Sequence, residues 1–204
     1  MSSLPVEVLG PEDVPEILDV FCDAFSDYPV MKYVLGPGGN THARLEKLIG
    51  YFVARRVRLG GPLFGLRDPG GTLLGVATVT VPIESEPPPD LLLTCDRTFE
   101  SIGVECRARH ENYAAAAALF GGLGPHHHLN MLGVRRIHHG RGLGRPLIEA
   151  VLDLARKHTS STGVSLTTEV DDNVRLYEHF AFEVVGRAQV DGAFETRGLF
   201  WRRP

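Results

Sequence analysis

Three glycines at alternate positions, Gly140, Gly142 and Gly144, form the most informative pattern in this sequence. They follow an apolar segment that ends at Val134 and precede an amphipathic segment, so we expect a strand, a loop and a helix in that order. Glycine allows backbone conformations that a Cβ would forbid, and it lets another molecule approach closely. The first N–H groups of a helix lack intrahelical partners and lie at the positive end of its dipole. The segment therefore predicts an anion-binding loop, most naturally for phosphate.

The spacing of these glycines excludes the two commonest phosphate-binding loops. A Rossmann loop needs G-x-G-x-x-G, but Arg145 stands three residues after Gly142. A P-loop ends in Gly-Lys-Ser/Thr, whereas Gly144 is followed by Arg145 and Pro146. A glycine-rich loop without a ligand is the alternative at this point. Four basic residues around the loop suit an anionic ligand better than a nucleic-acid duplex, with solvated surface charge as the alternative: Arg135, Arg136, Arg141 and Arg145.

Three consecutive histidines, His126, His127 and His128, raise the question of a metal site. Successive side chains of a strand point to opposite faces, so His126 and His128 share a face and His127 points away. Three ligands cannot converge locally in that arrangement. We therefore expect no metal. The pair beside the loop, His138 and His139, is expected to face phosphates instead.

The composition is that of a soluble globular protein. Of the 204 residues, 43% are hydrophobic and 23% are charged, and the net charge of −4 does not suggest a nucleic-acid-binding protein. The cysteines Cys22, Cys95 and Cys106 form no CxxC motif, which suits a reducing compartment. The first residues lack the pattern of a secretory signal, and the longest apolar stretch, Leu73–Val81, is too short to span a bilayer. We expect one cytoplasmic domain over residues 1–204, with no membrane or nucleic-acid partner; the oligomeric state stays open.

Hydrophobic periodicity and turn residues predict seven strands and five helices around the loop. The resulting fold class is mixed α/β, with helices on both faces of a mixed sheet. Strands are expected at Val6–Leu9, Pro62–Leu66, Leu73–Pro82, His126–Val134, Gly163–Glu169, Glu183–Val190 and Thr196–Arg202. Helices are expected at Pro11–Phe25, Thr41–Leu59, Leu91–Phe120 with an interruption at Gly103, Gly144–His158 and Asn173–Phe180, and loops at Glu84–Asp90 and Gly121–Pro125.

Two motifs resemble those of the GNAT N-acetyltransferases. The glycine loop resembles their coenzyme A pyrophosphate loop, Gln/Arg-x-x-Gly-x-Gly/Ala, with His139 in the Gln/Arg position. The segment that begins at Asn173 resembles their N-V-x-L-Y-x-x-x-G-F motif, and the expected order of elements is the GNAT order over essentially the whole chain. The words Ala24–Pro29 and Leu132–Val134 resemble the narrower puromycin N-acetyltransferase-like branch. The resemblance implies a mostly antiparallel sheet of about seven strands.

The sequence departs from these motifs at three positions. Thr167 stands where the branch usually has a glutamate, which removes a carboxylate that would act as a base. Ala181 replaces the usual glycine, and we expect this change to alter only packing. His139 weakens one contact to the pyrophosphate without removing the backbone amides.

The resemblance implies that acetyl-CoA is the cosubstrate, without a metal. It implies that backbone groups of Leu132, Gly133 and Val134 pair with the pantetheine arm, where a bulge would direct an N–H at the thioester carbonyl. Asn173 would bond the same arm, or cap its helix. The residues that would hold the pyrophosphate are His139, Gly140, Arg141, Gly142, Leu143, Gly144 and Arg145.

For catalysis, the resemblance implies that Tyr177 protonates the departing sulfur; packing on the helix is its alternative role. The general base is less well determined. Glu169 follows Thr167 by two residues, hence lies on the same face of an extended strand, and His128 could act through a water. Structural roles for both remain open. We expect the acceptor amine to meet Tyr28, Asn130 and Thr167.

The function implied by the resemblance is direct acetyl transfer from acetyl-CoA to a primary amine of a small molecule. Two alternatives stay open: a non-catalytic acyl-CoA-binding regulatory module, which the threonine at position 167 permits, and a protein-modifying acetyltransferase.

Overall fold

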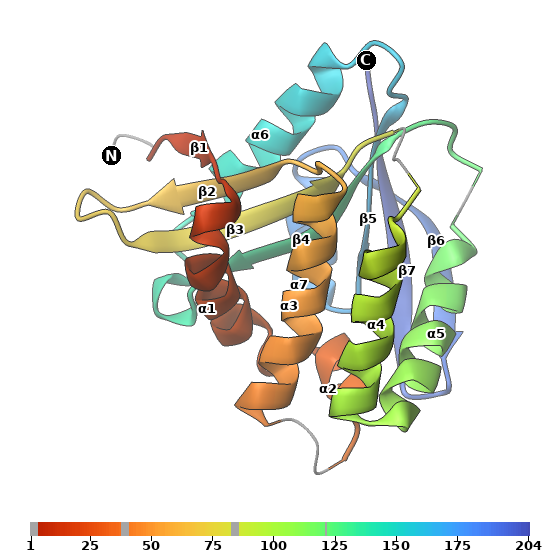
Figure 1. Ribbon diagram of the computed structural model, residues 1–204. Helices are drawn as coiled ribbons and strands as arrows, with labels where there is room; N and C mark the ends of the chain where they lie inside the picture. The colour runs from red at the N-terminus through yellow and green to blue at the C-terminus, as the bar shows by residue number, and fades with distance from the viewer. Residues whose placement is uncertain (1–3, 38–40, 83–85, 121) are drawn as a thin grey trace.

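The structure, a computed structural model, describes residues 4–37, 41–82, 86–120 and 122–204. Its described residues form a seven-stranded sheet in the order β1-β2-β3-β4-β5-β7-β6 (Figure 1). Neighbouring strands are antiparallel except for β4 and β5, which are parallel. This confirms the mostly antiparallel mixed sheet. The strands are β1 (Val6–Val8), β2 (Leu63–Arg67), β3 (Leu73–Thr80), β4 (His127–Val134), β5 (Gly163–Thr168), β6 (Glu183–Val190) and β7 (Phe194–Arg202).

Helices cover both faces of this sheet, as expected. In Figure 1, α1 and α3 lie in front of the sheet and α6 lies behind it. None of the described helices is long and apolar enough to cross a membrane. The helices are α1 (Val14–Phe25), α2 (Pro29–Leu35), α3 (His42–Arg58), α4 (Pro89–Ile102), α5 (Val104–Ala118), α6 (Gly144–Lys157) and α7 (Asp171–Glu178).

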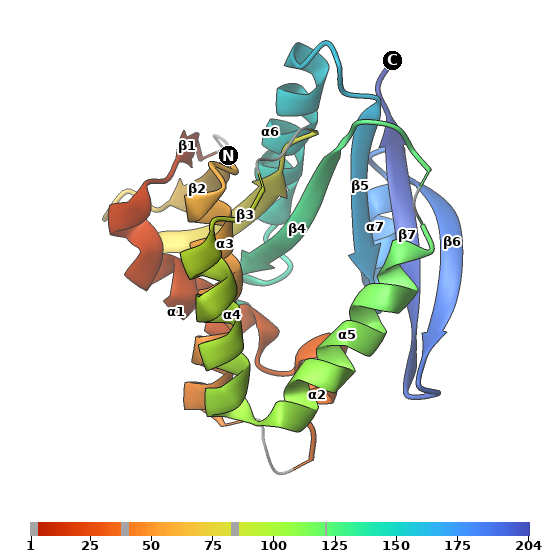
Figure 2. The ribbon, with the colours of Figure 1, turned by 45° about the vertical axis from the view of Figure 1, so that its right-hand side comes forward.

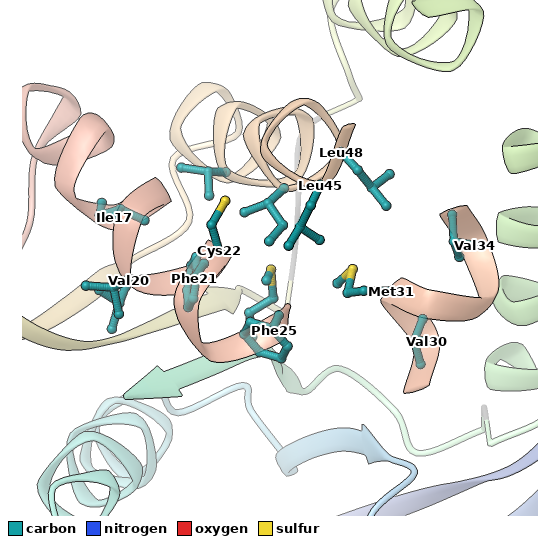
Figure 3. Close-up of a cluster of buried hydrophobic side chains, with 14 of the residues drawn as sticks. Ile17, Val20, Phe21, Cys22, Phe25, Val30, Met31, Val34, Leu45 and Leu48 are labelled. Atoms are coloured by element: carbon teal, nitrogen blue, oxygen red, sulfur yellow. The ribbon is translucent and has the colours of Figure 1, made fainter. Parts of the chain in front are cut away.

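The helices are held by apolar stripes at helical spacing. On α1, Ile17, Phe21 and Phe25 turn inward and meet Leu45 and Leu48 of α3 in one buried cluster (Figure 3). Helix α6 packs a second stripe against the opposite face. Burial of each large apolar side chain contributes roughly 1.5–3 kcal/mol, so these contacts fix the helices rigidly on the sheet. Both ends of the glycine loop are therefore fixed, one by β4 and the other by α6.

The parallel strands β4 and β5 are paired over only part of their length. Only two pairs join the strands, His127 with Val164 and His128 with Ser165. Beyond them β4 and β5 diverge (Figure 2). The pairing of β4 with β3 shifts register around Asn130, which is the extra residue of a bulge. The expected bulge thus exists, but our placement of it within residues 132–134 was wrong.

The remaining differences from the expected elements are one short helix and small shifts of element boundaries. Helix α2 was not predicted, and Pro29 occupies its first turn. Gly103, with φ +116°, divides the long helical segment into α4 and α5, as expected. Helix α4 begins at Pro89, so the loop expected at residues 84–90 ends earlier than predicted. Residues 84, 85 and 121 of the two expected loops lie outside the described residues.

Ala181 shows why a glycine is usual at its position. It adopts φ +63°, in the left-handed region that a Cβ disfavours. Its N–H donates to the Glu178 carbonyl and the N–H of Phe182 donates to the Tyr177 carbonyl, which together close α7 in a Schellman motif. Our expectation of a packing effect alone was therefore wrong, because the replacement also strains the backbone.

We expect Ala181→Gly to stabilise the protein by about 1 kcal/mol, because glycine relieves the left-handed strain. Thermal unfolding should show a rise in Tm of about 2–4 °C for a chain of this size. The matched control is Ala150→Gly within α6, which should lower Tm, since glycine disfavours a helix interior. A fall in Tm for Ala181→Gly would contradict the strain argument.

Candidate functional site

The glycine loop has the backbone geometry of an anion cradle. Gly140 and Gly142 have φ values of +75° and +74°, and a Cβ built on either would meet no atom within 4 Å. The space beside the Cα atom of each glycine is thus open to a ligand. Gly144 begins α6, and Pro146 lies in the first turn of that helix, where its missing N–H costs no hydrogen bond. The open loop and the helix N-terminus fit a pyrophosphate group.

Two side chains of the loop already have protein partners. His139 Nε2 lies 2.9 Å from the Val134 carbonyl oxygen, so the ring ties the loop to the end of β4. The guanidinium of Arg145 lies over the ring of Phe180 at 4.9 Å and 3.5 Å from a Glu149 carboxylate oxygen. The N–H of Arg145 donates to the Gly142 carbonyl, so this amide is not free for a ligand.

A single cavity of about 1140 Å³ runs from this loop across the diverging strands. Its volume exceeds the roughly 300–1,000 Å³ typical of a site for one small ligand, which suits two substrates. The residues expected at the site line this cavity, apart from Arg141. The lining residues expected at the catalytic and acceptor positions are Tyr28, His128, Asn130, Thr167, Glu169 and Tyr177.

Glu169 lines the cavity and is held by hydrogen bonds from two other elements. Its Oε1 accepts hydrogen bonds from Thr196 Oγ1 at 2.7 Å and from Tyr113 Oη at 3.2 Å. Its Oε2 is buried and accepts no hydrogen bond from the described residues. Burial raises the pKa of Glu169, although the hydrogen bonds and the nearby Arg197 partly oppose the shift. The carboxylate is therefore more basic than an exposed glutamate.

Hydroxyl groups connect Glu169 to the helices and strands that surround it. Tyr113 on α5 also contacts Thr167, with 2.9 Å between the two hydroxyl oxygens. Tyr28 Oη lies 3.1 Å from Thr168 Oγ1, which also accepts a hydrogen bond from the Asn173 side chain at 3.1 Å. The network links the acceptor side of the cavity to α7. Thr167 is thus connected to Glu169 through the hydroxyl of Tyr113.

His128 occupies a poorer position for a base. Its Nδ1 lies 2.8 Å from Ser165 Oγ, and burial lowers its pKa to about 4. The ring is neutral at pH 7, and a base with such a low pKa accepts a proton from an amine weakly. Asn130, the bulged residue, is exposed, and its Oδ1 accepts a hydrogen bond from Thr80 at 3.0 Å.

Tyr177 and Asn173 lie one turn apart on α7 and both line the cavity. Tyr177 is only 8% exposed, and burial raises its pKa, so its hydroxyl stays protonated at neutral pH. Its ring packs edge-on against Phe182 at 5.5 Å. Helix α7 begins at Asp171 after Val170, so Asn173 lies in the first turn and is not the N-cap.

His127 and His128 point to different surroundings, as the alternation of side chains along a strand predicts. His127 is fully buried, with its Nδ1 2.9 Å from Ser161 Oγ, whereas His128 lines the cavity. His126 precedes β4, and its Nδ1 lies 2.7 Å from the Gly124 carbonyl oxygen. Among the described residues, no group of three His, Cys, Asp or Glu side chains is arranged to hold a metal ion.

Three residues of the site were not singled out from the sequence: Tyr113, Thr168 and Thr196. Each contacts Glu169 or Tyr28 through a hydroxyl, and each comes from a different element. A single hydroxyl-bearing residue in a helix or strand forms no sequence motif that would mark it as part of a site. The strand-periodicity argument did not select Thr168 either, because alternation places it on the opposite face from Thr167 and Glu169.

Comparison with known families gives one match, to the acetyltransferase (GNAT) family profile over residues 76–182. This range is more than half of the chain and contains β4, the glycine loop, α6, β5 and α7. A search of curated proteins found no match.

Several solved structures share the fold across nearly the whole chain. The structure described as histone acetyltransferase HPA2 and related acetyltransferase, from Corynebacterium glutamicum, has a TM-score of 0.71 at 22% identity and covers 100% of this chain and 97% of its own. Arylalkylamine N-acetyltransferase 2 from Aedes aegypti gives 0.66 at 15% identity, with 100% of both chains covered. Ribosomal-protein-alanine N-acetyltransferase from Brucella melitensis gives 0.58 at 17%, with 98% and 99% covered.

Proposed function

The chain belongs to the GNAT acetyltransferase family and is therefore an acyltransferase; from this premise we propose that it transfers the acetyl group of acetyl-CoA directly to a primary amine of a small molecule in the cytoplasm. One observation carries the proposal. A single cavity joins an anion cradle at the glycine loop to a buried carboxylate with a raised pKa, across the opening between β4 and β5.

In this proposal the loop residues hold the cosubstrate by its pyrophosphate. Backbone groups near Gly142 and the N-terminus of α6 supply the donors, and α7 contributes Asn173 beside the pantetheine arm. Acetyl-CoA bound there supplies a thioester, an activated acyl group. The β4 edge at residues 129–134, which has no strand partner on the β5 side, lies along its path.

The chain supplies a base and an acid for the transfer. The amine nitrogen bonds to the thioester carbonyl carbon, and the carbon–sulfur bond breaks. Glu169 takes the proton that the amine loses, and Tyr177 gives a proton to the departing sulfur. We prefer Glu169 to His128 because its pKa is raised toward neutrality, whereas that of His128 is lowered to about 4.

We expect Tyr177→Phe to lower kcat about 100-fold, because the phenol supplies the proton that the departing sulfur needs. The Kd for acetyl-CoA should change little, since the ring and its packing on Phe182 are kept. Steady-state kinetics and calorimetry measure the two effects. A fall of only a few-fold would assign Tyr177 to packing alone.

The test of the function is release of coenzyme A, followed with a thiol-reactive dye, against a panel of small primary amines and of peptides with free N-termini. Both acceptor classes occur among the structural neighbours, as the names of the Aedes aegypti and Brucella melitensis enzymes state. Faster release with a small amine supports the proposal. Faster release with a peptide indicates the protein-modifying alternative, and acetyl-CoA binding without any release indicates the regulatory one.

A further inference from the structure

One part of the cavity, which we call the chamber, is formed by one face each of α2, α3 and α5. On α5, the residues that line it are His110, Tyr113, Ala114 and Ala117, which follow the i, i+3, i+4, i+7 spacing of one helix face. Figure 2 shows α5 diverging from α4 and approaching the β6–β7 side of the sheet. Tyr113 on this face of α5 donates a hydrogen bond to Glu169, so the chamber adjoins that carboxylate.

The opposite walls of the chamber are largely apolar. Met31 and Val34 of α2 and Leu48 and Phe52 of α3 line it. Met31, Val34 and Leu48 also belong to the buried cluster of Figure 3. The imidazole of His110 stacks on Phe52, with 5.5 Å between ring centroids and 30° between planes. Burial lowers the pKa of His110, so this stacked pair is a neutral aromatic wall at pH 7.

Charges around the chamber orient a bound amine. Among the described lining residues, Glu169 and Asp172 are the carboxylates, and Asp172 is paired with Arg175. Arg55 and Arg56 line the α3 side. An ammonium group is attracted toward Glu169 and repelled from α3, so the rest of the acceptor extends into the chamber.

We propose that the acceptor is a primary amine carried on a bulky aromatic or apolar body, and that Ala114 and Ala117 set the size of that body. The proposal rests on the function proposed above and names its substrate class. The two alanines present only methyl groups to the chamber, which leaves room for a flat ring on the same face of α5 as His110. An aromatic ring there would meet apolar and aromatic surfaces rather than polar ones.

The same walls disfavour a peptide acceptor. Each peptide unit brings an N–H and a C=O that must be hydrogen-bonded when they are buried. The chamber walls on Met31, Val34, Leu48 and Ala117 offer side chains without donors or acceptors. A primary amine on an unsubstituted hydrocarbon ring has no polar group beyond the nitrogen, so its body loses no hydrogen bond on entry.

The experiment compares 2-phenylethylamine with ethylamine and with a dipeptide amide bearing a free N-terminus, by kcat/KM. We expect 2-phenylethylamine to exceed both by at least about 10-fold, since apolar groups in such pockets discriminate by that order. Equal or better use of ethylamine or of the peptide overturns the proposal and leaves acetyl transfer itself intact. If no amine is acetylated, the proposed function fails. The substrate class is then tested by calorimetry of 2-phenylethylamine binding with coenzyme A present, where absence of binding overturns it.

Ala114→Phe tests the chamber wall directly, because its ring would occupy the acceptor space. We expect kcat/KM for 2-phenylethylamine to fall at least about 10-fold more than that for ethylamine. The matched control is Ala115→Phe, an exposed neighbour on α5 outside the cavity lining, which should leave the ratio of the two amines unchanged. Circular dichroism and the Kd for acetyl-CoA show whether each variant is folded. If Ala114→Phe does not fold, Ala117→Leu is measured in its place. An unchanged ratio in a folded variant overturns the assignment.

Discussion

Glu169→Gln should lower kcat/KM about 1,000-fold, the largest catalytic effect that we expect from one substitution. The amide keeps the size of the side chain and an oxygen acceptor for Thr196 and Tyr113, but it cannot take a proton from the amine. Removing a general base typically costs about 10²–10⁴-fold. The exposed Glu183 provides the matched control, and Glu183→Gln should leave the rate unchanged.

The pH profile makes this assignment specific. A base acts only when it is deprotonated, so kcat/KM of the wild-type enzyme should fall as the pH drops through the raised pKa of Glu169. This acid limb should be absent in Glu169→Gln and present in His128→Asn. The opposite result, with the limb lost only in His128→Asn, would identify His128 as the base. A limb and rate unchanged in both variants would mean that catalysis rests on proximity, with bulk water accepting the proton.

Gly142→Glu should weaken acetyl-CoA binding at least about 100-fold, which corresponds to about 2.7 kcal/mol. The substitution places a carboxylate in the anion cradle and a Cβ at a residue with φ +74°. Calorimetry measures the Kd. Unchanged affinity in a folded Gly142→Glu variant would overturn the assignment of the cradle.

The control for this substitution separates charge in the site from backbone strain. Gly71 in the β2–β3 turn also has a positive φ, +89°, and open space around a built Cβ, but it lies outside the cavity lining. Gly71→Glu should therefore carry the same strain and bind acetyl-CoA normally. Similar losses of affinity in both variants would point to strain and instability rather than to the anion site.

The sequence determined the features that depend on neighbours along the chain. Glycine at positions 140 and 142 permits the positive φ angles that the loop adopts there. The apolar stripe of α6 and the alternation of His127 and His128 follow from the periods of helices and strands. The short helix α2 was missed because seven residues give too little periodicity to distinguish a helix from a loop.

Only the tertiary structure decided which distant residues surround the reacting groups. Glu169 meets Tyr113, 56 residues earlier, and Thr196, 27 residues later, because β7 pairs with β5 and α5 packs on β7. The bulge lies at Asn130 because a bulge depends on the register between two strands, which neither strand encodes alone. The acceptor chamber likewise exists only where the faces of three helices meet, and no local pattern in the sequence specifies that meeting.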